Sequence, residues 1–188
     1  SVDFQEIEKL QHSGDWDAMA KILARKAAQV EAAGAEFLLI CTNTMHRVAN
    51  EISAAINIPL LHIADATASA IKEAGVRTVG LLGTKFTMEQ DFYKGRLQHH
   101  GLNVLVPSEA DRNTVHKIIY EELCLGKINV ESRKEFLRII DDLQRRGAEA
   151  VIEGCTEIGL LVKQEHTPVP LFDTTKIHAQ QAVVKALN

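Results

Sequence analysis

Apolar residues follow two kinds of pattern along the chain. Short apolar runs without alternation occupy positions 37–40, 79–82, 104–106 and 151–152. Strands that are buried on both faces, as in parallel sheets covered by helices, have this pattern. Ahead of the first run, apolar residues recur every three or four positions, which predicts one face of a helix. That set is Trp16, Met19, Ala20, Leu23, Ala27 and Val30.

Glycines follow the amphipathic stretches and predict where helices end. Glycine accepts the left-handed conformation that closes a helix more readily than other residues do. The glycines in such positions are Gly34, Gly75, Gly101, Gly126 and Gly147. Predicted helices and strands alternate throughout, which favours an α/β fold. Residues 1–4 are interpreted as the tail of a further strand.

Two segments, 33–43 and 146–157, repeat one pattern. Each begins with a helix-ending glycine, continues through an apolar strand, and stops at Cys-Thr. A polar helix start follows, and then a second short strand entered through Pro59 or Pro170. The repeat predicts two similar halves, each presenting one thiol at the carboxyl end of a strand.

The repeated cysteines, Cys41 and Cys155, are the leading candidates for chemistry. Amide donors and the positive end of a following helix favour the thiolate form of a cysteine. Two thiols facing each other across a cleft can remove a proton from one face of a carbon and return one to the other. A single cysteine is more often a small buried hydrophobe, but the matched pair favours function. Cys124, within a predicted helix over 115–125, is interpreted as a core residue.

Polar residues next to these cysteines could bind a small carboxylate. Thr42, Asn43, Thr44 and Thr156 offer side-chain donors beside the exposed amides of a helix start. Capping of that helix by Asn43 or Thr44 is an equal alternative, because it uses the same amides.

The loop 83–87 follows another predicted strand. It lacks the spacing of a phosphate-binding loop, so a nucleotide site is not expected. Thr84 and Thr87 are interpreted instead as donors to a small carboxylate.

Composition and charge exclude several classes of function. Of the 188 residues, 46% are hydrophobic and 24% charged, as in a typical globular protein. The net charge of −4 gives no reason to expect nucleic acid or an anionic membrane as a partner. No transmembrane run or signal peptide is recognisable. The three cysteines, an odd number without CxxC spacing, favour a reducing compartment, and the cytoplasm is expected. The eight histidines show no zinc pattern.

The segments 41–46 and 153–158 closely resemble the aspartate/glutamate racemase family, and most of all its bacterial amino-acid racemases related to aspartate racemase. Further agreement lies at positions 1–4, 62–67, 81–84 and 172–174. The resemblance implies two pseudo-symmetric α/β domains with parallel sheets and the active site in the cleft between them. Its last helix returns to the first domain, which implies domains of 1–74 plus 173–188 and of 75–172.

The resemblance also implies the chemistry. Cys41 and Cys155 become the two acid/base residues, and neither a metal nor pyridoxal phosphate takes part. The substrate α-carboxylate is expected near the neighbouring donors Thr42, Asn43, Thr44 and Thr156.

The sequence departs from the family in two respects. The family begins with a strand, a glycine-rich turn of the form Gly-Leu-Leu-Gly-Gly-Met and a helix, and this unit is expected to be missing here. Gln11 and Glu122 align with the places where aspartate-selective relatives hold the side-chain carboxylate with basic residues. Since Glu122 would repel a second carboxylate, we expect neutral amino acids as substrates.

The leading hypothesis is therefore a cofactor-independent amino-acid racemase that uses two cysteines. One alternative is an isomerase or decarboxylase of a small diacid on the same fold, and another is a non-catalytic ligand-binding or scaffold protein. The expected partner is a small amino-acid substrate, and a homodimer is left open.

Overall fold

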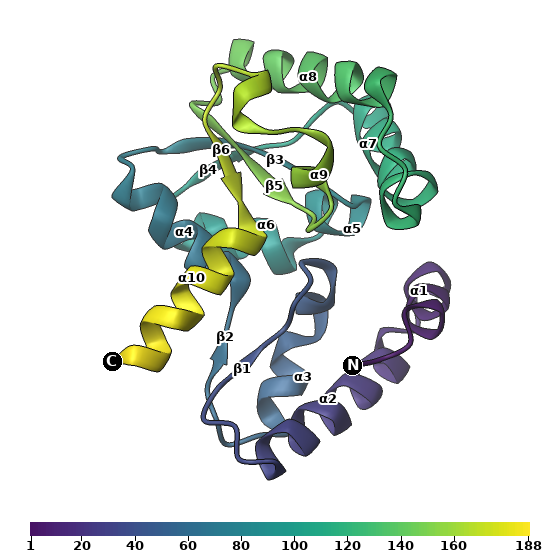
Figure 1. Ribbon diagram of the computed structural model, residues 1–188, viewed down its shortest axis with the longest axis vertical. Coiled ribbons are helices and arrows are strands. Elements are labelled where there is room, and N and C mark those ends of the chain that lie inside the picture. The colour runs from purple at the N-terminus through teal and green to yellow at the C-terminus, as the bar shows by residue number, and fades with distance from the viewer. The chain divides into compact units, whose positions relative to one another are not determined.

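The computed structural model of the protein describes residues 1–188, and their contacts form two compact units (Figure 1). The first unit contains residues 1–40 and 45–62, and the second contains residues 41–44 and 63–188. All strand pairs in both units are parallel, which confirms the predicted α/β class with parallel sheets.

The first unit consists of helices packed on a two-stranded sheet. Its strands pair with Leu38 opposite Leu60 and Leu39 opposite Leu61. Each strand is only two residues long and half-buried, so the prediction that the run 37–40 is buried on both faces was wrong. The elements are α1 (Phe4–Ser13), α2 (Trp16–Ala32), β1 (Leu38–Leu39), the short 3₁₀ helix η1 (Thr44–Val48), α3 (Ala49–Ala54) and β2 (Leu60–Leu61).

The start of the chain is helical, so the prediction of a strand tail at residues 1–4 was wrong. Asp3 caps α1, and its carboxylate accepts a hydrogen bond of 2.9 Å from the amide of Gln5. An aspartate at this position satisfies an amide that the first helical turn leaves without a partner, and it therefore fixes the helix start at Phe4.

The second unit is built on a four-stranded parallel sheet in the order β4-β3-β5-β6. The two central strands are buried almost along their whole length, as the unbroken apolar runs predict. The strands are β3 (Thr78–Gly83), β4 (Asn103–Leu105), β5 (Ala150–Gly154) and β6 (Leu171–Asp173). The helices are α4 (Ile63–Glu73), α5 (Lys85–Glu89), α6 (Asp91–His99), α7 (Glu109–Glu121), η2 (Leu123–Leu125), α8 (Val130–Arg145), α9 (Ile158–Leu161), η3 (Gln164–His166) and α10 (Thr174–Leu187).

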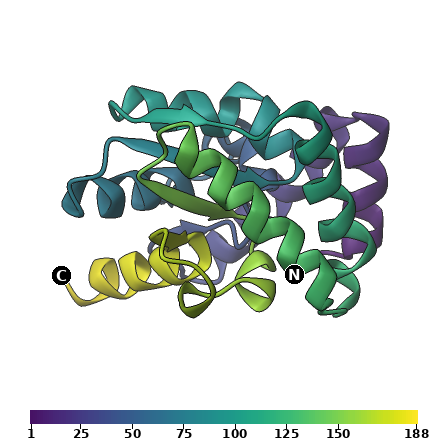
Figure 2. The ribbon, with the colours of Figure 1, turned by 90° about the horizontal axis from the view of Figure 1, so that it is seen from above.

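Helix α8 lies over the centre of this sheet and contacts β3 and β5 (Figure 2). The approach is close at Gly80, where an added methyl group would lie 2.8 Å from the Leu143 side chain. A glycine in the middle of β3 therefore lets the helix pack directly against the strand. Tyr93 and Phe136 are the largest side chains that are fully buried in this core.

The boundaries of the two compact units differ from those of the predicted domains. Residues 63–74 and 173–188, which the prediction assigns to the first domain, lie with the second unit. The reason is local packing: α10 packs against α4 and also contacts β5 and β6. The assignment of these residues to a racemase domain stays a prediction.

The five predicted helix-ending glycines have positive φ angles, between 71° at Gly126 and 100° at Gly147, which confirms their role. Gly14, which was not predicted, closes α1 in the same way. Cys124 packs against the core of the second unit but is only half-buried, so the prediction of a core residue is confirmed in part. Helix α7 ends at Glu121, and the cysteine lies in η2. No helix of the chain is long and apolar enough to cross a membrane.

Candidate active site

The carboxyl ends of β3 and β5 bring two predicted site residues to one edge of the sheet. Gly83 and Gly154 are register partners at the ends of these strands, and Thr84 and Cys155 follow them directly. The strands meet closely here, because a methyl group on Gly154 would lie 2.7 Å from the carbonyl oxygen of Leu82. Glycine at this position therefore allows the pairing that places Cys155 beside the β3 loop.

The segment 41–44 is bonded to the same edge. The hydroxyls of Thr44 and Thr84 share a hydrogen bond of 3.0 Å after β3. The Asn43 amide donates a bond of 3.0 Å to the hydroxyl of Thr174, which follows β6. Because β5 lies between β3 and β6, the segment that begins with Cys41 crosses the carboxyl end of β5, which leads into Cys155. Both Cys-Thr segments thus meet at one sheet edge.

Hydrogen-bond directions at Thr174 define a free acceptor on Asn43. The Thr174 hydroxyl donates to the carbonyl oxygen of Glu153 at 2.8 Å, so it must accept from the Asn43 amide nitrogen. This orientation leaves Asn43 Oδ1 buried and without a hydrogen-bond partner. A buried, unpaired acceptor is costly unless a ligand supplies a donor to it.

The Cys155 thiol is held in its protonated form. Its Sγ donates a hydrogen bond of 2.9 Å to Glu157 Oε2. Burial raises the pKa of Cys155 well above its usual value, and the charge of Glu157 raises it further. The expectation that a helix start favours the thiolate was wrong for Cys155, because α9 has only 4 residues and a carboxylate precedes it.

The two candidate cysteines differ in their exposure. The Cys41 side chain is exposed, whereas Cys155 is half-buried. The adjacent threonines, Thr42 and Thr156, are both half-buried. Each cysteine is thus followed by a hydroxyl that solvent or a small ligand can reach.

Thr84 has a structural role that the sequence did not predict. It caps α5 by accepting a bond of 3.3 Å from the Thr87 amide, while its hydroxyl also contacts Thr44 and Thr87. Neither Asn43 nor Thr44 caps α3, which begins at Ala49 after Val48 without a side-chain cap. The alternative of capping at that helix is therefore not realised.

The two residues aligned with substrate selection are each anchored within their own unit. Gln11 is buried in the first unit, with its amide 3.5 Å from Met45 Sδ. Glu122, at the end of α7, accepts a bond of 2.7 Å from the Ser132 hydroxyl. Their roles in substrate binding stay predictions.

Sequence reasoning missed Glu157 and Thr174 as site residues. Glu157 stands two positions after Cys155, in a segment that the sequence marked as a helix start. Thr174 lies in the stretch 172–174 that supported the family resemblance. The role of Thr174 depends on a distant partner, because its hydroxyl links β5 to Asn43, which lies 131 positions away. No group of three or more His, Cys, Asp or Glu side chains is arranged to hold a metal ion.

Known proteins resemble this chain over most of its length. Residues 1–182 match the model of the Asp/Glu/hydantoin racemase family. The broad specificity amino-acid racemase RacX of Bacillus subtilis is 24% identical over 171 residues, which cover 90% of this chain and 73% of RacX.

Two solved structures cover the whole chain and 82% of their own chains. A candidate Asp/Glu racemase from Yersinia pestis is 53% identical, with a TM-score of 0.92. An aspartate racemase homologue from Pyrococcus horikoshii is 37% identical, with a TM-score of 0.86.

Proposed function

Because this chain belongs to the Asp/Glu/hydantoin racemase family, we propose that it is an amino-acid racemase whose opposed acid and base are Cys41 and Cys155. The observation that carries the proposal is the path of segment 41–44. Its bonds to Thr84 and Thr174 bring both Cys-Thr segments to the carboxyl edge of one sheet. Ligands of open α/β sheets bind at such edges.

In the proposed reaction, the Cys41 thiolate removes the α-proton and becomes a thiol. The Cys155 thiol donates its proton to the opposite face of the carbanion and becomes a thiolate. The reverse reaction exchanges the two roles. The raised pKa of Cys155 supports this assignment, because a thiol that keeps its proton at rest is ready to act as the acid. Neither a metal nor pyridoxal phosphate enters these steps.

Polar groups around the cysteines would orient the substrate. Asn43 Oδ1 is the acceptor for the α-ammonium group, since it is buried and has no other partner. Thr42 and Thr156 supply donors to the α-carboxylate. Donors fixed in advance around the carboxylate stabilise the negative charge that develops when the α-proton leaves.

We further propose that the substrates are neutral amino acids. The Glu122 side chain is anchored by the Ser132 hydroxyl, and a second substrate carboxylate facing it would be repelled. The name of RacX, a broad specificity racemase, supports activity on several amino acids. The measurement is kcat/KM for both enantiomers of aspartate, glutamate, homoserine, methionine and lysine. A clear preference for aspartate would contradict this choice of substrate.

The racemase proposal is tested by isotope exchange. In deuterated water, each enantiomer of a substrate should gain deuterium at the α-carbon as it converts into the other. Nuclear magnetic resonance follows the exchange and chiral chromatography follows the conversion, with the Cys155→Ser variant as the control. Absence of both exchange and conversion across the amino-acid panel would sink the proposal. Release of carbon dioxide from a small diacid would favour a decarboxylase instead.

A further inference from the structure

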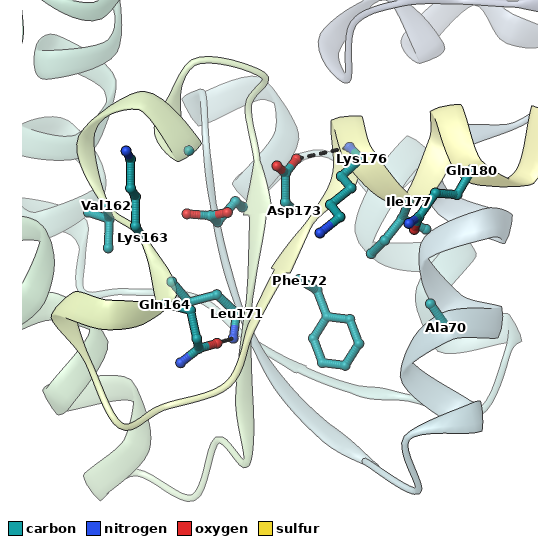
Figure 3. A pocket seen from close by; sticks show the side chains of 12 residues that line it. Ala70, Val162, Lys163, Gln164, Leu171, Phe172, Asp173, Lys176, Ile177 and Gln180 are labelled. Carbon is teal, nitrogen blue, oxygen red and sulfur yellow. Dashed lines mark hydrogen bonds between the residues drawn. The ribbon is translucent and has the colours of Figure 1, made fainter.

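A cavity lies in the second unit, beside β5, the strand that leads to Cys155. It has a volume of about 410 Å³ and is lined by residues from β5, β6, α9, α10 and the segment after α9, with Ala70 from α4 (Figure 3). Cys155 is not among the lining residues. The side chains that line the cavity are therefore different from those that form the cysteine site.

The inner wall of this cavity carries a buried carboxyl group without a partner. Glu153 is only 4% exposed, and its Oε1 has no hydrogen-bond partner. A polar group in this position lowers stability unless a donor reaches it. The neighbouring Asp173 uses Oδ1 to cap α10 through the amides of Thr175 and Lys176. The Asp173 Oδ2 atom is left facing the cavity side.

Glu153 and Asp173 face a common small space in front of Gly159. A methyl group added to Gly159 would lie 3.5 Å from Asp173 Oδ2 and 3.8 Å from Glu153 Oε2. Both carboxyl groups therefore border the space in front of Gly159, and an ammonium group packed against Gly159 in this space lies near both. An ammonium nitrogen carries three donors and no acceptor, which suits two converging carboxylates.

The remaining lining suits the other parts of a zwitterion. Lys163 and Lys176 provide positive charge, and Figure 3 shows Asp173 next to Lys176, with Lys163 beyond Asp173. Leu171, Phe172 and Ile177 provide an apolar wall. Two acidic and two basic side chains match a ligand that carries one charge of each sign.

Gln164 also lines the cavity, but its amide is already used. It donates to the carbonyl oxygens of Thr167 and Val169 and accepts from the Leu171 amide. It therefore shapes the wall rather than offering a ligand contact. Two carboxylates are also few for a metal ion, since Ca²⁺ takes about six to eight oxygen ligands.

We propose that this cavity binds a free α-amino acid as a zwitterion, at a site separate from the two cysteines. The ligand ammonium lies in front of Gly159 between Glu153 and Asp173. Its carboxylate pairs with Lys176, and its side chain lies on the apolar wall. The site would let the protein bind an amino acid without acting on it.

The probe is 1-aminocyclopentane-1-carboxylate, an α-amino acid that has no α-hydrogen and cannot be racemised. Calorimetry with the full chain should show binding at this site that Gly159→Ala weakens, because the added methyl group narrows the space in which the ammonium lies. The helix favours alanine over glycine, so this variant should fold. Loss of charge-assisted hydrogen bonds predicts a fall in affinity of about tenfold or more. Glu165→Gln, which neutralises an exposed carboxylate on η3, is the matched control and should bind normally.

The pH dependence of binding gives a second readout. Burial, together with the charge of Asp173, raises the pKa of Glu153 from 4.5 to about 8. The charged groups that face it are Asp173 from β6, Lys176 from α10 and Lys163 after α9. Because an ammonium ligand favours the carboxylate form, binding should release a proton at pH 7, and affinity should rise from pH 6 to pH 8. Glu153→Gln should abolish both the proton release and most of the affinity.

The analogues that carry a single charge test the ligand class. Cyclopentylamine lacks the carboxylate and cyclopentanecarboxylate lacks the ammonium, so each should bind more weakly than the amino acid. Binding of the amine as tightly as the amino acid would overturn the zwitterion assignment. An isotherm unchanged by Gly159→Ala would overturn the site, since amino-acid binding at the cysteines would survive this substitution.

Discussion

The two Cys-Thr segments share a sequence pattern but differ in the residue two positions after each cysteine. After Cys41 this residue is Asn43, whose neutral amide ties the segment to Thr174. After Cys155 it is Glu157, whose carboxylate accepts a hydrogen bond from the thiol. One residue therefore fixes the position of the backbone, while its counterpart fixes a protonation state. The comparison shows that a repeat can place two like groups while single substitutions give them unlike roles.

The residues two positions before the cysteines differ as well. Leu39 in β1 is apolar and half-buried, as a short strand of the small sheet allows. Its counterpart in β5 is Glu153, a buried carboxyl group in the central sheet. A hydrophobic residue there would remove the cost of burying a polar group. The carboxyl group at this position gives the second segment a property that the first one lacks.

The largest expected effect comes from replacing either cysteine. Cys41→Ser and Cys155→Ser should each lower kcat for racemisation by about 10²–10⁴-fold, the usual contribution of a general acid or base, because a hydroxyl is a much weaker acid than a thiol. Cys124→Ser is the matched control and should leave the rate nearly unchanged. Chiral chromatography of the product measures the rates. Equal losses in all three variants would refute the assignment of roles.

Glu153 should make the free energy of unfolding depend on pH, which its apolar counterpart Leu39 cannot do. The pKa of Glu153 is raised from 4.5 to about 8, so between these values the folded chain holds a proton that the unfolded chain has lost. Its contribution to stability is therefore complete below pH 4.5 and is lost as pH rises through about 8. Glu153→Gln should remove this dependence, and above pH 8 it should raise the free energy of unfolding by on the order of a few kcal/mol.

Urea unfolding of wild type and Glu153→Gln from pH 4 to pH 9 measures the effect. The difference between the two curves isolates Glu153 from the other titrating groups. Parallel curves across the whole range would show that the carboxyl group finds a donor in the folded protein.

Thr174→Val tests the anchor that only the first segment has. The substitution keeps the shape of the side chain but removes the bonds to Asn43 and to the Glu153 carbonyl oxygen. We expect a loss of about 1–3 kcal/mol of unfolding free energy, together with slower racemisation. Thr174→Ser keeps the hydroxyl and should retain most of both properties. If the serine and valine variants behave alike, the hydroxyl does not hold the segment.

The smallest expected effect comes from a substitution that makes the second Cys-Thr segment resemble the first. Glu157→Asn removes the carboxylate that faces the Cys155 thiol, so the pKa of Cys155 should fall. Peptide mass spectrometry after treatment with iodoacetamide at several pH values should show faster alkylation of Cys155 near pH 8. Alkylation of Cys41 in the same sample is the internal reference. An unchanged ratio of the two rates would mean that burial alone holds the proton.

Much of the central sheet could be predicted from local sequence. The apolar runs at 79–82 and 151–152 predicted buried parallel strands, because a strand covered on both faces has no polar side to show. The positive φ angles at the helix-ending glycines were predictable for a similar local reason. The helical start at Phe4 was missed because residues 1–4 were interpreted as the tail of a strand, whereas Asp3 acts as a cap.

The sequence by itself determined the α/β class, the repeated Cys-Thr pattern and the family, since these depend on local spacing and on recognisable segments. Only the tertiary structure decided the surroundings of each cysteine. The bond between Asn43 and Thr174 joins residues 131 positions apart, and the space shared by Glu153 and Asp173 depends on the pairing of β5 with β6. Burial and nearby charges set a pKa, and both depend on which distant segments pack together.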